Sequence, residues 1–206
     1  MRRDYRMRDA DRRTFRRVKS VRYRRNRRRS SRINIRYFSR PAELSRSPLV
    51  VVCAGAKAIL DLPNTLEYLE TCGVPVIGYQ TDEFPAFYSR ESGLAVNYNA
   101  QTPAEIAAIA RAHWSLGLET AVLVGNPPPA DSALPADKVE KVILQALAAA
   151  KEMGIRGAAM TPFLLERVNQ LSQGASMHTN LALLRNNARL AAQIARELVV
   201  PILPSV

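Results

Sequence analysis

Residues 49–57 read LVVVCAGAK, six apolar residues followed by a short turn of small residues that ends in a lysine. A continuous run rich in β-branched residues is typical of a strand that is buried on both faces of a parallel sheet. The Gly and Ala residues that follow allow a tight turn from strand to helix. The stretch therefore predicts a parallel-sheet protein with Lys57 in the turn at the carboxyl end of a strand.

The residues on the carboxyl side repeat this alternation of strand and helix. We expect further strands at 75–79 and 121–125, and helices at 63–72, 102–117, 135–153, 161–174 and 177–199. The helix start at residue 102 is well marked, because Thr102 suits the cap, Pro103 suits the first helical position, and Glu105 can reach back to the cap amide. The pattern predicts an α/β protein, layered α/β/α with a partly parallel sheet, whose functional loops lie at the carboxyl ends of the strands.

The net charge of +12 comes from one end of the chain. Residues 1–47 hold 19 Lys and Arg against 4 Asp and Glu, whereas residues 48–206 hold 11 against 14. We expect residues 1–41 to be disordered alone, because dense like charges repel and the few apolar residues cannot build a core. Three interpretations stay open: a nucleic-acid-binding arm whose guanidinium groups pair with phosphates, a solvated tail without a role, or an out-of-frame reading of GC-rich coding DNA.

The composition excludes several classes of protein. With only Cys53 and Cys72, the chain is not a disulfide scaffold, and Cys53 is expected to pack in the core. No apolar stretch approaches the ~20 residues that span a bilayer. The amino terminus also lacks the apolar middle of a secretory signal. We therefore expect a soluble, cytoplasmic protein.

Lys57 and two asparagines are the candidates for chemistry. Partial burial would lower the pKa of the Lys57 amine, and a neutral amine is a nucleophile for carbonyl carbon. The alternative is that the Lys57 stem packs while its ammonium reaches water. Asn180 and Asn187 lie on one face of the last expected helix, on a stripe with Leu184, Ala191, Ile194 and Leu198. Their amides need partners, either a ligand or the backbone of a neighbouring loop, because an unpaired buried amide costs ~1–3 kcal/mol. Asn186 is expected to face away from this stripe.

Three other groups are weaker candidates. His113 and His178 lie far apart in the sequence without a pattern of carboxylates or cysteines, so we expect no metal site there. Asp82 and Glu83 form an acidic pair in a loop, either a solvated turn or a group that orients a substrate. Four nearby aromatic residues could form a lid or an interface: Tyr79, Phe84, Phe87 and Tyr88.

Several phrases of the sequence, taken together, resemble the pseudouridine-5'-phosphate glycosidase family. They are CAGAK at 53–57, TDEFPAF at 81–87, TPFLL at 161–165 and the asparagines of the last helix. The resemblance runs from about residue 42 to residue 198. It implies reversible cleavage of the carbon–carbon glycosidic bond of pseudouridine 5'-phosphate to uracil and ribose 5-phosphate. It further implies that Lys57 forms an imine with the ring-opened sugar, that Asn180 contacts the substrate, and that the protein uses manganese and is a homotrimer.

The resemblance fails ahead of residue 42. Family members have a preceding stretch that supplies a general-acid glutamate, a second substrate-binding lysine and the aspartate that holds manganese. Counting back from CAGAK places that aspartate at Arg36, so this chain is expected to have no metal ligand. The abrupt loss favours an out-of-frame leader over residues 1–41, followed by the carboxyl-terminal part of the glycosidase domain at 42–206. Because the general acid and the metal ligand are missing, we expect this truncated chain to have little or no catalytic turnover by itself.

Overall fold

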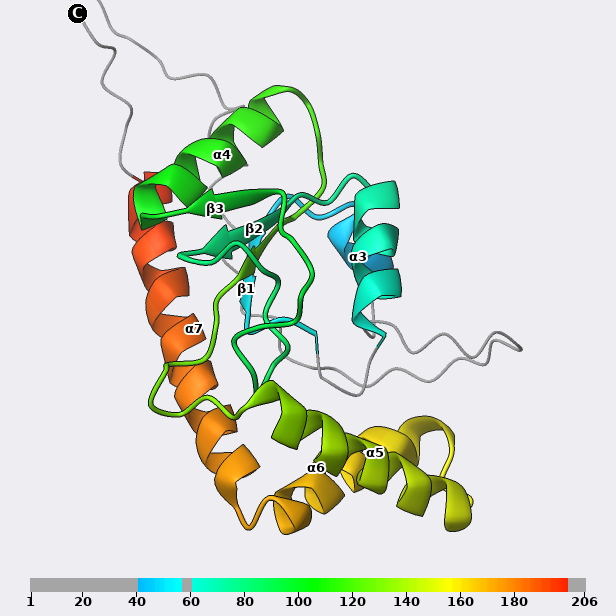
Figure 1. The fold of residues 1–206 in the computed structure, drawn as a ribbon. Coiled ribbons are helices and arrows are strands. Elements are labelled where there is room, and N and C mark those ends of the chain that lie inside the picture. The colour runs from blue at the N-terminus through cyan, green and yellow to red at the C-terminus, as the bar shows by residue number, and fades with distance from the viewer. Residues whose placement is uncertain (1–40, 57–60, 200–206) are drawn as a thin grey trace, which may run out of the picture. The chain divides into compact units, whose positions relative to one another are not determined.

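The computed structural model describes residues 41–56 and 61–199. The expectations for residues 1–40 and for Lys57 therefore fall outside the described residues. The elements (Figure 1) are α2 (Pro41–Leu44), β1 (Val50–Cys53), α3 (Leu62–Thr71), β2 (Val76–Tyr79), β3 (Tyr98–Ala100), α4 (Pro103–Ser115), β4 (Val122–Gly125), α5 (Ala136–Glu152), the short 3-10 helix η1 (Gly157–Ala159), α6 (Met160–Leu171) and α7 (Ala175–Val199).

The four described strands form one sheet in the order β1-β4-β2-β3, and every pair is parallel. Val50 lies opposite Val122, and Val76 lies opposite Leu123. The predicted α/β class is confirmed, and the described sheet is wholly rather than partly parallel. The sequence did not indicate β3, because a strand of three residues with one buried side chain carries no usable periodicity.

Helices cover both faces of this sheet. Val122 and Val124 point toward α4 and α7, where they share a core with Ile106 and Ile194. The alternate residue Leu123 packs on the other face, in a core to which α3 contributes. Figure 1 shows α3 and α7 on opposite sides of the strands. The alternation of side chains along each strand thus produces the α/β/α layers that were predicted.

Burial differs between the two most apolar strands. Every residue of β4 is buried, whereas every residue of β1 is only half-buried. β4 lies between β1 and β2, but among the described strands β1 pairs with β4 alone. The prediction of a strand buried on both faces is therefore right for β4. For β1 it is right in part, because Val50 and Val52 pack on one core and Val51 and Cys53 on the other, but all four are only half-buried.

The start of α4 follows the predicted capping pattern with one difference. Thr102 Oγ1 accepts a hydrogen bond from the Glu105 amide at 3.2 Å. The Glu105 carboxylate accepts from the Gln101 amide at 2.9 Å and from the Thr102 hydroxyl at 3.1 Å. The carboxylate therefore accepts from the amide of Gln101, one residue before the Thr102 amide that was predicted as its partner.

A second apolar cluster lies between α5 and α6. It contains Val139 and Ile143 from α5, Leu164 and Val168 from α6, and the ring of Tyr88. Within the described residues, no helix has the length and apolar character needed to cross a membrane.

Candidate active site

The turn that follows β1 is packed against the TDEFPAF segment. Gly55 has a φ of +88° and forms a β-bridge with Ala86. The Phe87 amide donates to the Ala54 carbonyl oxygen at 2.9 Å. A Cβ atom on Gly55 would lie 1.5 Å from the Pro85 carbonyl oxygen, so only glycine permits this approach. Two motifs that lie about thirty residues apart in the sequence therefore meet directly before Lys57 in the chain.

Asn126 joins the end of β4 to the end of β1. Its backbone amide donates to the Cys53 carbonyl oxygen at 2.7 Å, and the residue is 3% exposed. Asn126 was not among the candidate residues predicted from the sequence. The signal that could have singled it out is a polar residue directly after a buried strand, where α/β proteins place functional groups.

Three side chains of α7 bind the segment that follows β4. Asn126 Nδ2 donates to Asn187 Oδ1 at 3.0 Å, and Asn186 Nδ2 donates to the Pro127 carbonyl oxygen at 3.2 Å. The Thr179 hydroxyl donates to the Ser132 carbonyl oxygen. Asn187 is therefore hydrogen-bonded to a neighbouring loop, which was one of the two alternatives. Its partner there is the side chain of Asn126 and not the loop backbone. The prediction that Asn186 faces away is wrong, because its amide reaches the same loop.

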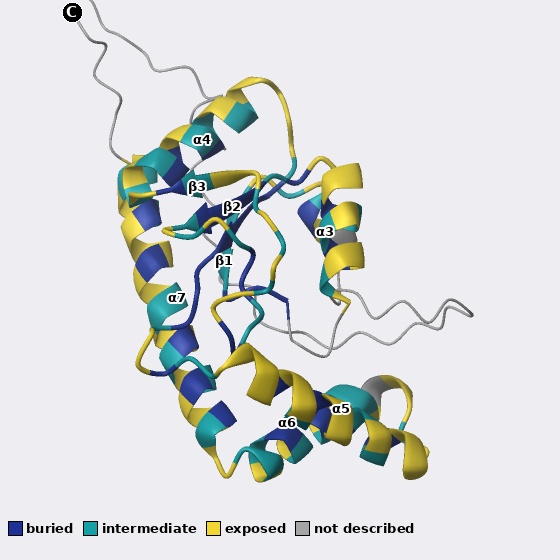
Figure 2. Cartoon of the chain, viewed as in Figure 1, coloured by how far each residue is buried: buried dark blue, intermediate teal, exposed yellow. Residues whose placement is uncertain are grey.

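The buried face of α7 differs from the predicted stripe. Two members of the stripe are confirmed, because Ile194 is buried and Leu198 packs against the same core. Two are wrong, because Leu184 is 55% exposed and Ala191 is also exposed. The other buried residues of this face include Thr179, Leu183 and Leu190. Figure 2 shows buried residues recurring on successive turns of α7. Leu183 and Leu184 both fit the spacing of a helical stripe, and only the folded structure shows that Leu183 is the buried one.

Asn180 lies two turns before Asn187 on α7 and is half-buried. Its side chain makes no hydrogen bond to any residue that the structure describes. A half-buried amide without a protein partner has donors and an acceptor to offer a ligand.

Glu83 of the acidic pair accepts from the backbone, and Asp82 accepts from a side chain. Glu83 Oε2 accepts from the amides of Ser92 and Gly93 at 2.9 and 2.8 Å. Asp82 Oδ1 accepts from Asn99 Nδ2 at 2.9 Å. Both carboxylates are thus engaged within the fold, which neither the solvated-turn nor the substrate interpretation anticipated.

The four aromatic residues do not form one lid. Phe84 belongs to the core on the α3 side, and Tyr79 packs on the α4 and α7 side. Phe87 and Tyr88 contact each other edge to face at 4.8 Å and join the α5–α6 cluster. The sheet therefore separates side chains that the sequence places together.

The manganese that the resemblance implies stays a prediction. Within 41–56 and 61–199, no three His, Cys, Asp or Glu side chains are placed together to hold a metal ion. His113 Nε2 instead lies 2.7 Å from Thr120 Oγ1. Arg36, near which the resemblance would place the family's metal aspartate, lies outside the described residues.

The Cys53 thiol has a packing role. It lies against the core on the α3 side, and burial raises its pKa to about 11 although a hydrogen bond with the Gly55 backbone opposes this. A thiol that stays protonated at neutral pH is a poor nucleophile, so the predicted packing role is confirmed.

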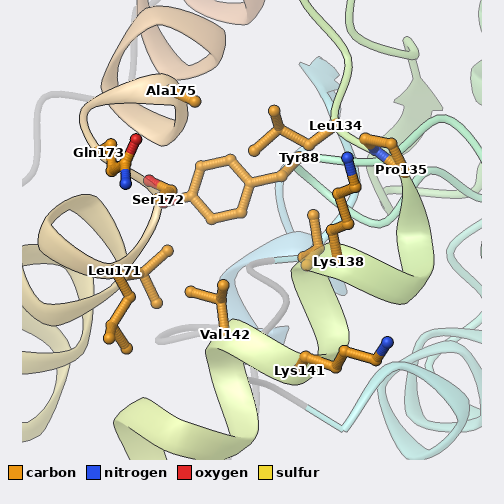
Figure 3. Close-up of a pocket in the computed structure, with 12 residues that line it drawn as sticks. Tyr88, Leu134, Pro135, Lys138, Lys141, Val142, Leu171, Ser172, Gln173 and Ala175 are labelled. Carbon is orange, nitrogen blue, oxygen red and sulfur yellow. The ribbon is translucent and has the colours of Figure 1, made fainter.

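A separate cavity of about 520 Å³ lies between Tyr88, α5 and the junction of α6 and α7 (Figure 3). Its walls are mainly apolar, with Val139 and Leu171 among them, and the lysines of α5 stand at its edge. Burial raises the pKa of the Tyr88 phenol, and a hydrogen bond with the Ser176 side chain partly offsets this increase. Asn126, Asn180 and Asn187 do not line this cavity, so it is distinct from the carboxyl edge of the sheet.

Curated relatives share the carboxyl-terminal part of this chain. It is 53% identical over 156 residues to the pseudouridine-5'-phosphate glycosidase of Caldanaerobacter subterraneus subsp. tengcongensis, and 57% identical over 157 residues to that of Gemmatimonas aurantiaca. Each match covers 76% of this chain and 51% of the relative. The chain therefore spans about half the length of the curated relatives it matches.

Two solved structures have a similar fold. A prealnumycin C-glycosynthase, solved in complex with ribulose 5-phosphate, matches with a TM-score of 0.73 at 35% identity, over 78% of this chain and 53% of its own. An indigoidine synthase A-like protein of Thermotoga maritima matches with a TM-score of 0.68 at 36% identity, over 75% and 51%. None of these comparisons supports a nucleic-acid-binding role. The model of the family described as indigoidine synthase A like protein matches residues 41–197, and the chain belongs to this family.

Proposed function

We propose that this chain carries the imine-forming part of a pseudouridine-5'-phosphate glycosidase site. The observation that carries the proposal is the meeting of CAGAK, TDEFPAF and α7 at one edge of the sheet. The Gly55 turn contacts Pro85, and Asn126 links the ends of β1 and β4 to α7. The named relatives supply the reaction, and they match this chain over half of their length.

The reaction explains why a lysine is needed. A carbon–carbon bond to ribose has no oxygen or nitrogen leaving group. In the proposed step the Lys57 amine adds to the anomeric carbon of pseudouridine 5'-phosphate as the bond from that carbon to the ribose ring oxygen breaks, which opens the sugar. The released oxygen takes a proton and the new amine nitrogen loses one. The nitrogen lone pair then forms a C=N bond, the electrons of the C–C bond pass to the uracil ring carbon, and this carbon takes a proton. Water hydrolyses the resulting iminium to ribose 5-phosphate and regenerates Lys57.

Asn180 is the proposed substrate contact on α7. Its half-buried amide has no partner among the described residues, so it can bind a polar group of the substrate without breaking a bond of the fold. A buried polar group that gains a partner only with the ligand contributes to specificity, because a ligand lacking the matching group leaves it unpaired.

Full turnover requires groups that the described residues do not provide. The resemblance assigns the general acid and the manganese ligand to the part of the relatives that this chain does not match. Catalytic groups that act together have strongly non-additive effects, so we expect background turnover from this chain alone. We further propose that the protein is a homotrimer and is located in the cytoplasm. Analytical ultracentrifugation of the purified chain tests the trimer.

Reductive trapping tests the role of Lys57. The chain is incubated with ribose 5-phosphate and cyanoborohydride, digested, and its five lysines are compared by mass spectrometry. We expect the adduct to be concentrated on Lys57 and to be lost in Lys57→Arg, whose guanidinium stays protonated. The exposed Lys138 and Lys141 report background modification. Equal labelling of all lysines, or no adduct in a folded sample, would refute the proposal.

A further inference from the structure

The hydrogen bond between Asn126 and Asn187 has no part in the chemistry described above. Asn126 is 3% exposed and Asn187 is half-buried, and their side chains are joined at 3.0 Å. Two apolar side chains of the same shape can replace a buried hydrogen-bonded pair with little change in stability. The distinct property of the amide pair is its directionality, because a hydrogen bond weakens steeply as its angle departs from linear.

This pair joins the end of the strand that precedes Lys57 in the sequence to the helix that carries Asn180. Asn126 also donates from its backbone to Cys53, which precedes Lys57 by four residues. Asn187 lies on the same helix as Asn180, seven residues later, and at 1.5 Å per residue the two are about 10 Å apart along the axis. Asn126 and Asn187 together connect the strand that leads to Lys57 with the helix that presents Asn180.

We propose that Asn126 and Asn187 are a positioning pair, which sets the distance between the Lys57 turn and Asn180 without touching the substrate. The inference rests on the proposed function. The amide bond opposes sliding and rotation of α7 against the end of β4. The Asn186 contact with Pro127 supports the same register from the adjacent residue. A misplacement of about 1 Å can lower a rate by about a hundredfold, so such a restraint matters to imine formation.

Two variants separate the hydrogen bond from the packing. Asn187→Asp keeps the oxygen that accepts from Asn126 Nδ2, so the bond survives. The double variant Asn126→Leu with Asn187→Leu fills the same space and leaves no amide unpaired, but the bond is lost. We expect the double variant to keep its unfolding midpoint and to trap ribose 5-phosphate on Lys57 at least about tenfold more slowly at saturating sugar. Asn187→Asp should retain most of the wild-type rate.

Hydrogen–deuterium exchange of α7 gives a second readout that does not depend on the sugar. We expect peptides covering residues 176–188 to exchange faster in the double variant than in Asn187→Asp. Wild-type trapping and wild-type exchange in the double variant would overturn the positioning role. If the wild-type chain forms no adduct on Lys57, the proposed function fails. The hydrogen–deuterium exchange of α7 then remains as the test of whether Asn126 and Asn187 restrain this helix. If the double variant does not fold, Asn187→Ser replaces it and is judged by the same two measurements.

Discussion

Replacing Gly55 by alanine probes the contact between the CAGAK turn and the TDEFPAF segment. The new methyl group would lie 1.5 Å from the Pro85 carbonyl oxygen, and the glycine has a φ of +88°. Gly73 is a matched control, because its φ is +66° and nothing lies within 4 Å of a methyl group placed there. The two substitutions share the backbone strain and differ in the steric clash.

The expected loss at Gly55 follows from these two terms. A left-handed φ costs an alanine about 1–2 kcal/mol, which is the loss expected at Gly73. At Gly55 the Pro85 carbonyl must in addition shift by about 2 Å to reach the 3.4 Å of an ordinary contact. This shift breaks the Phe87–Ala54 backbone hydrogen bond, and each hydrogen bond lost adds about 1 kcal/mol. We therefore expect Gly55→Ala to lower the free energy of unfolding by about 2–3 kcal/mol.

Urea denaturation of both variants against the wild-type chain measures this difference. We expect the midpoint of Gly55→Ala to fall clearly below that of Gly73→Ala with the same slope. Trapping on Lys57 should also fall in folded Gly55→Ala and stay unchanged in Gly73→Ala. Equal midpoints for the two variants would show that the turn and the Pro85 segment are not in close contact, and the geometry argued for the site would then be wrong.

Three further outcomes are expected. Leu190→Ala should lower the free energy of unfolding by about 2–5 kcal/mol, whereas Leu184→Ala on the exposed face of α7 should be nearly neutral, as measured by urea unfolding. Thr102→Ala should cost about 1 kcal/mol by loss of the cap of α4, with increased amide exchange at Glu105 as a second measurement. Because the pKa of Cys53 is raised to about 11, its folded form keeps a proton that the unfolded thiol loses above about 9, so stability should fall as pH rises between these values. Cys53→Ala should reduce that fall in unfolding measurements at pH 8 and pH 10, and an identical pH profile in the variant would contradict it.

Local signals were sufficient for much of the fold. The start of α4 follows from Thr102 and Pro103, because an N-cap bond forms between neighbours in the sequence. The ends of α3 and α5 follow from Gly73 and Gly154, which both have a positive φ. The buried strand β4 follows from its apolar run. In each case the interactions that define the element lie within a few residues of one another.

The site depends on contacts that no local pattern contains. The sequence placed Lys57 after a strand and Asn187 on a helix, but the partner of Asn187 is Asn126, 61 residues away. The exposure of Leu184 and the burial of Leu183 differ because one side of α7 meets the sheet. The hydrogen bonds that Glu83 accepts depend on the fold in the same way, since the amides of Ser92 and Gly93 reach it only in the folded chain.

The sequence by itself determined the type and approximate bounds of most helices and strands, and the family resemblance that points to Lys57 and Asn180. The tertiary structure alone decided which faces are buried, that β1 is only half-buried, and that Asn126 joins β1 to α7. Helix and turn formation is governed by hydrogen bonds between near neighbours, whereas sheet order and side-chain pairing require segments that are distant in the chain to come together.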